Sequence, residues 1–115
     1  MGQGNVQAAV YQGISYRFYS VDVRTSNLAF HWKNEQGQPM ASFGSLADEL
    51  KKEGKDLTFA TNGGIFSPNL NPVGLYIENG KLLNSLNNKE GNGNYFLKPN
   101  GVFYITKNKE VAVVE

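Results

Sequence analysis

The residues with the clearest chemical potential gather between Phe59 and Gly101, where short apolar runs start and stop at turns rich in asparagine and glycine. Glycine lets backbone approach a ligand closely, and amide side chains both donate and accept hydrogen bonds. Sugar hydroxyls and phosphate oxygens need such groups at short range, and a lysine can neutralise an anion. The candidate substrate-binding residues are Asn62, Gly63, Gly64, Asn94, Lys98 and Asn100.

These turns also have a purely structural interpretation. Asn-Gly pairs are the preferred residues of two-residue hairpin turns, so each turn taken singly is typical of a plain strand connection. Lys98 could equally be a solvated surface charge. A sugar phosphate or glycan ligand is nevertheless the partner that all of these groups together would suit.

Asp22, Glu78 and Glu90 are the carboxylates nearest to the turn-rich centre, and Asp22 and Glu78 are the candidate catalytic residues. Each could instead be a solvated strand charge. The only histidine, His31, stands beside Trp32 in an expected strand, where an edge or half-buried position is more typical than a base. Known nucleotide-binding motifs are missing.

Composition narrows the function classes further. The chain has 115 residues, no cysteine and a formal net charge of +1. The lack of cysteine excludes disulfides, thiolate metal sites and thiol nucleophiles, and a single histidine excludes a histidine-rich metal site. We therefore expect no metal and no cofactor. Balanced charge argues against nucleic acid as a partner, and no stretch is apolar enough to predict a membrane span or a signal peptide, so the chain as given is expected to be soluble.

A single helix is expected between Ser42 and Lys55, because apolar residues recur there at three- and four-residue spacing. Ser42 or Ser45 could cap its start, and Gly54 is placed to end it.

The other expected elements are strands. Residues 14–23 and 28–33 should form a hairpin, 56–61 a short buried strand, and 73–78 a strand that returns through Asn79-Gly80 into 81–84. Residues 95–98 should pair with 102–105, and a last turn at Asn108 should lead to a strand at 110–114. The sum predicts an α+β fold, a predominantly antiparallel sheet with one main helix packed on it. Residues 1–13 are expected to be a loosely ordered lead-in, within which Val6 to Tyr11 suggest a weak strand or an ordered segment, and residues 14–115 are expected to be a single α+β domain.

Several segments resemble the phosphodiester glycosidase family, which includes the lysosomal uncovering enzyme and many bacterial proteins. The similar segments are 21–22 with 28–33, 42–43, 59–66, 72–80 and 91–103. They occur in the same order at compact spacing, and the similarity is to the bacterial branch. The resemblance extends over nearly all of the chain from Tyr16 onward, and it implies the N-terminal half of a larger family domain.

The resemblance implies hydrolysis of a sugar 1-phosphodiester at its glycosidic bond, with an exported or periplasmic location. Asn62, Gly63 and Gly64 would form the central turn, while Asn94, Lys98 and Asn100 would approach the substrate. The short chain could be inactive by itself, because family domains continue with further motifs. The alternative function is a non-catalytic carbohydrate or cell-wall binding module.

The end of the chain suggests one more partner. Val111 to Val114 are apolar on both alternating faces, which is typical of a strand covered from both sides. We therefore expect self-association, or pairing with a complementary segment, through residues 110–115.

Overall fold

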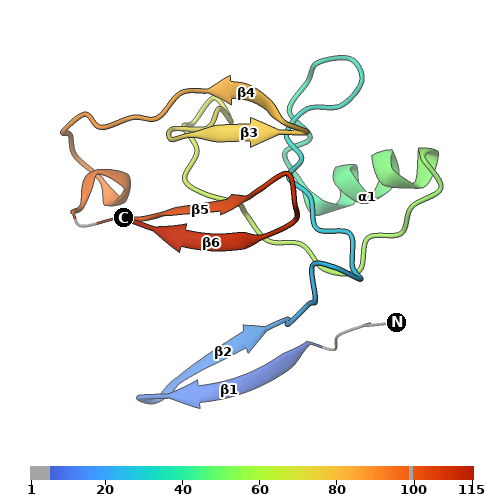
Figure 1. Cartoon of the computed structure of the whole chain (residues 1–115), viewed down its shortest axis with the longest axis horizontal. Helices are drawn as coiled ribbons and strands as arrows, with labels where there is room; N and C mark the ends of the chain where they lie inside the picture. Colours follow the sequence, from blue (N-terminus) through green and yellow to red (C-terminus); the bar gives the residue numbers. More distant parts are fainter. Residues whose placement is uncertain (1–5, 99) are drawn as a thin grey trace. The chain divides into compact units, whose positions relative to one another are not determined.

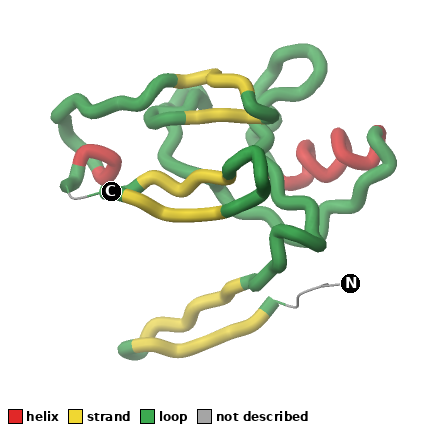
Figure 2. The backbone as a smooth tube through the Cα atoms, in the orientation of Figure 1, coloured by secondary structure: helices red, strands yellow, loops and turns green. Residues whose placement is uncertain are grey.

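The computed structural model describes residues 6–98 and 100–115. The chain divides into two compact units, one made of residues 1–28 and 104–112 and the other of residues 29–103 and 113–115. Figure 1 shows the order of the elements, and Figure 2 shows that much of the backbone between them is loop. Each unit is described by itself below.

The first unit contains a hairpin of strand β1 (Gln7–Tyr11) and strand β2 (Ile14–Phe18). The two strands are antiparallel, with Ala9 opposite Tyr16. Gln12 and Gly13 both have positive φ, 50° and 77°, as a tight two-residue turn with right-handed strand twist requires. The segment assigned to a loosely ordered lead-in therefore contains a paired strand.

The expected hairpin between 14–23 and 28–33 is wrong. The chain turns at Asp22, whose carbonyl accepts the amides of Thr25 and Ser26 at 3.1 and 2.9 Å. This turn ends the extended run early, and the closer segment 7–11 becomes the partner of β2. Residues 28–33 hold only an isolated bridge, between Lys33 and Pro39.

Helix α1 (Phe43–Lys52) confirms the expected helix. Ser42 is its N-cap, and the Ser42 hydroxyl accepts the Ser45 amide at 3.1 Å. Gly54, at φ 73°, donates its amide to the Lys51 carbonyl at 3.0 Å and ends the helix, as expected. Leu50, on this helix, is 7% exposed and is the one apolar residue classed as buried within the described ranges.

Strands β3 (Tyr76–Glu78) and β4 (Lys81–Asn84) form the expected Asn79-Gly80 hairpin in the second unit. Two expected strands are wrong: residues 56–61 are irregular, and residues 95–98 give way to a short 3₁₀ helix η1 (Asn94–Phe96). The 3₁₀ turn curves the chain so that the Tyr95 carbonyl accepts the Asn100 side-chain amide at 2.9 Å. An extended 95–98 segment would not fold back on Asn100 in this way.

Strands β5 (Val102–Ile105) and β6 (Val111–Val114) complete the fold and confirm the expected last turn. The α+β class holds in its coarse form, since antiparallel strand pairs accompany one α-helix. The described residues nevertheless form three two-stranded sheets in place of one larger sheet. In the part of the chain that the structure describes, no helix has the length and apolarity to cross a membrane.

The turn between β3 and β4 gives a stability prediction. Gly80 has φ 77°, a conformation that disfavours a side chain, so Gly80→Ala should lower the free energy of unfolding by about 1 kcal/mol. Gly44 lies in α1 with only the Ser42 Oγ near its absent Cβ, at 3.9 Å, so the control Gly44→Ala should raise stability by about 0.5–1 kcal/mol. Urea unfolding of both variants measures the two shifts. An unchanged or raised stability of Gly80→Ala would contradict the turn geometry.

Candidate functional site

The central Asn62-Gly63-Gly64 segment is irregular with a bend at Gly64, called the Gly63 turn below, and it packs against an aromatic ring. A Cβ on Gly63 would stand 3.3 Å from the Phe30 ring, so a larger residue here would require the ring to move by a few tenths of an ångström. A Cβ on Gly64 would meet nothing within 4 Å. The Asn62 side-chain amide donates to the Gly64 carbonyl at 3.4 Å, within its own turn. The close contact with Phe30 therefore explains a glycine at position 63, whereas the space beside Gly64 is open.

Phe30 belongs to a cluster of edge-to-face aromatic rings. Its ring centroid lies 6.1 Å from that of Tyr76 and 5.9 Å from that of Phe103. Trp32 contacts Tyr76 at 5.9 Å and donates its indole N–H to the Leu70 carbonyl at 2.8 Å. Edge-to-face contacts of this kind fix ring orientation as well as burying area. The cluster thus links the Gly63 turn to strand β3.

Tyr76 connects the cluster to a candidate catalytic residue. Tyr76 and Glu78 are two residues apart on β3 and share one face, so the Tyr76 hydroxyl donates to Glu78 Oε1 at 2.6 Å. Burial, together with the hydrogen bond to Glu78, raises the pKa of Tyr76 well above its ordinary value of 10.0. The hydroxyl therefore stays protonated at neutral pH and holds the carboxylate in one orientation.

Asp22, the other candidate carboxylate, lies in the first unit. Arg24 donates to both of its oxygens, at 3.1 and 3.0 Å, in an exposed bidentate pair. These hydrogen bonds lower the pKa of Asp22 and raise the pKa of Arg24. Asp22 is thus already engaged by a neighbour within its own turn.

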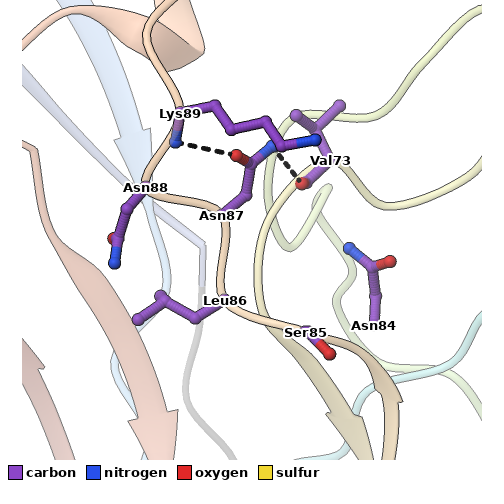
Figure 3. A pocket seen from close by; sticks show the side chains of 7 residues that line it. All are labelled: Val73, Asn84, Ser85, Leu86, Asn87, Asn88 and Lys89. Atoms are coloured by element: carbon purple, nitrogen blue, oxygen red, sulfur yellow. Dashed lines mark hydrogen bonds between the residues drawn. The ribbon is translucent and has the colours of Figure 1, made fainter.

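A recess opens beside the end of β4 (Figure 3). It has a volume of about 570 Å³, is open to solvent, and is lined by Val73 and residues 84–89. The Asn84 amide donates to the carbonyls of Pro72 and Gly74, at 3.2 and 2.6 Å. The Asn87 amide donates to the Val73 carbonyl at 3.3 Å. Two asparagine side chains therefore hold this irregular loop against the segment before β3.

The predicted residues after the recess belong to the same unit. Asn94 begins η1, and its side chain lies outside what the structure describes. Lys98 is exposed, and the Asn100 amide is bonded to the Tyr95 carbonyl. Tyr95 in turn donates its hydroxyl to the Asn87 carbonyl at 3.0 Å. Tyr95 therefore ties the segment 94–100 to the recess.

No cluster of three or more histidine, cysteine, aspartate or glutamate residues suited to a metal occurs within the described ranges. His31 is exposed.

Sequence reasoning missed three residues that build this region: Tyr76, Asn84 and Asn87. The Tyr-x-Glu spacing within an expected strand was a usable signal, because alternate strand residues share a face. The roles of Asn84 and Asn87 had no local signal, since their partners lie 10 to 14 residues earlier in the chain.

The two hydrogen bonds of the Asn84 side chain, called the loop clamp here, give a second stability prediction. Asn84→Ala leaves two backbone carbonyls without their donor and should cost about 1–3 kcal/mol of stability. Asn88 lines the same recess, but its amide makes no hydrogen bond to any described residue, so Asn88→Ala should change stability by less than about 0.5 kcal/mol. Thermal unfolding of both variants compares them. Equal losses would show that Asn84 is not a clamp.

Comparison with known proteins identifies the family. The profile of the phosphodiester glycosidase family matches residues 55–113, which is just over half of the chain. The chain belongs to the phosphodiester glycosidase family. The match contains the Asn62 turn, Glu78, the recess and the segment 94–100, whereas Asp22 lies outside it. The resemblance expected from the sequence is thereby confirmed.

A curated relative of this phosphodiester glycosidase family member is the uncharacterized protein YigE of Escherichia coli K12. The two are 33% identical over 96 residues, which cover 84% of this chain and 37% of YigE. The chain thus spans 37% of the length of that relative. No solved structure matches the chain at a significant level.

Proposed function

We propose that this chain contributes to the hydrolysis of sugar 1-phosphodiesters at the glycosidic bond. One observation carries the proposal: the family match contains Glu78, which the Tyr76 hydroxyl holds at 2.6 Å beside the aromatic cluster that packs on the Gly63 turn. Glycosidic cleavage generally uses two carboxyl groups at the scissile bond, and Glu78, with its orientation fixed by Tyr76, would supply one of them.

In the proposed reaction, water attacks the anomeric carbon of the sugar. The bond between that carbon and the phosphate oxygen breaks, and its electron pair leaves with the oxygen. Water gives hydroxyl to the sugar, and its other proton passes to a carboxylate or to the departing phosphomonoester. Glu78 would take that proton or stabilise the cationic sugar centre. Asn62, Gly64, Lys98 and Asn100, with Asn94, are proposed to approach the substrate.

Isotope labelling tests this reaction directly. The chain is incubated at high concentration with a sugar 1-phosphodiester in ¹⁸O-water, and the products are followed by ³¹P NMR and mass spectrometry. Glycosidic cleavage places the ¹⁸O on the sugar and none on the phosphomonoester. ¹⁸O in the phosphate would overturn the proposal, because it indicates attack at phosphorus.

A non-catalytic carbohydrate-binding role is the second candidate. It is favoured by the fact that the chain spans 37% of the length of YigE, so a complete set of catalytic groups need not lie within it. Saturable binding of a neutral glycan without any hydrolysis product in the labelling experiment would assign this function. Failure of both binding and hydrolysis would reject both candidates.

A further inference from the structure

The recess beside β4 carries polar groups that the loop itself does not use. The side-chain amides of Asn84 and Asn87 donate hydrogen bonds that hold the loop to residues 72–74, as described above. Asn87 also accepts the Lys89 backbone amide at 3.0 Å through its Oδ1 atom. Ser85, Asn88 and Lys89 also line the recess, and their side chains make no hydrogen bond to a described residue. Hydrogen bonds therefore fix the conformation of the loop, and the polar side chains of Ser85, Asn88 and Lys89 remain available to a ligand.

The side chains alternate along this loop (Figure 3). Leu86 and Asn88 extend from one side of the backbone, whereas Asn87 and Lys89 extend from the other side, toward Val73. The backbone bond from Lys89 to Asn87 fixes where the lysine stem begins. The lining of the recess includes a hydroxyl, an amide, a cation and the apolar side chains of Val73 and Leu86, which extend from both sides of the loop backbone.

The charge on Lys89 has no ion-pair partner among the described residues. No described carboxylate lies within ion-pair distance of its ammonium, whereas Lys52 and Lys55 pair with Glu49 and Glu53. Lys98 and Lys81 are similarly unpaired among the described residues, but neither lines this recess. Lys89 is therefore the one cation in the lining of this space.

We propose that the recess is the subsite for the phosphate-bearing part of the ligand, with the Lys89 ammonium as its counter-charge. The inference rests on the proposed function, since it names the part of the site that receives the phosphate. A charge-assisted contact of lysine with a phosphate oxygen is stronger than a neutral hydrogen bond. Ser85 and Asn88 supply donors and acceptors for hydroxyls in this solvent-open recess of about 570 Å³.

The position of the recess supports this assignment. Asn84 lines the recess and is also the cross-strand partner of Tyr76, whose hydroxyl holds Glu78. A ligand with its phosphate at Lys89 therefore lies next to the strand that carries the proposed catalytic carboxylate. From the sequence, Lys98 was the lysine expected to neutralise the phosphate. Lys98 follows η1 and lies outside the loop 84–89.

The test uses the ¹⁵N-labelled chain and NMR titration with inorganic phosphate, a sugar 1-phosphate and the neutral sugar. We expect shift changes centred on the amides of residues 84–89 with both phosphate ligands. Lys89→Met should raise the Kd of the sugar phosphate about tenfold and leave that of the neutral sugar nearly unchanged. Lys89→Arg should keep most of the affinity, because it keeps the charge.

Lys81→Met is the matched control, and it should raise the Kd by no more than about twofold, as is typical of an exposed charge. Shifts centred on residues 98–101, a tenfold loss with Lys98→Met alone, or no phosphate binding by the unmodified chain would overturn the proposal. Binding at 84–89 without turnover would leave the subsite in place and reject only the hydrolytic function. Turnover with an unchanged KM for Lys89→Met would support the hydrolytic function and reject the phosphate subsite at Lys89.

Discussion

Replacing Glu78 by glutamine should lower the rate of sugar 1-phosphodiester hydrolysis by about 10²- to 10⁴-fold, the usual contribution of a positioned acid–base group. Glutamine keeps the shape of the side chain and can still accept the Tyr76 hydroxyl, so the local packing should survive. The measurement is the initial rate of release of reducing sugar. An unchanged far-UV spectrum and melting point would show that the loss is chemical.

Two further variants define the role of Glu78. Tyr76→Phe keeps the aromatic contacts with Phe30 and Trp32 but removes the hydroxyl that orients the carboxylate, so a smaller loss of about tenfold in kcat is expected. Glu90→Gln changes an exposed loop carboxylate and should have no effect. If Glu78→Gln and Glu90→Gln behave alike, Glu78 is not the catalytic group.

Asp22→Asn decides whether a second carboxylate takes part. Asp22 is paired with Arg24 and lies outside the family match. A rate loss as large as that of Glu78→Gln would make Asp22 the second catalytic residue that the sequence suggested. A rate close to that of the unmodified chain would leave Glu78 as the only one of the two candidates with a chemical role.

The second large effect is expected in the association state of the chain. Val113 on β6 is 72% exposed, and β6 pairs only with β5 among the described strands, so one edge and an apolar surface of this strand are open. Such an edge favours pairing with another strand. We expect the chain to self-associate through residues 110–115 at micromolar concentration and to hydrolyse phosphodiesters slowly by itself.

Sedimentation velocity over a concentration series measures this association. Val113→Lys should shift the protein toward monomer, because a charge on an edge strand opposes pairing. Val10→Lys is the matched control, since Val10 is also a strand valine with 72% exposure, but on β1. Equal effects of the two substitutions would place the association elsewhere. A strictly monomeric chain with rapid hydrolysis would contradict the expectation altogether.

The features that sequence patterns predicted correctly are those set by neighbouring residues. Gly80 and Gly54 adopt the positive φ that their turn and helix end require, and Ser42 caps α1 through a bond to a residue three positions away. The apolar spacing of α1 and the Asn79-Gly80 hairpin signal are likewise local. The similar segments between residues 59 and 103, which occur in the same order as in the family, were enough to identify the family from the sequence.

The tertiary structure alone decided the pairing of strands and the contacts of the site. A strand segment such as 14–18 can pair with a segment before it or after it in the chain. Only the turn at Asp22 and the tight Gln12-Gly13 turn made 7–11 its partner. The bonds from Asn84 and Asn87 to residues 72–74 join segments that no short-range pattern relates. Side chains of one type can be ligand contacts or loop clamps, because their role depends on which carbonyl the folded chain brings within hydrogen-bond distance.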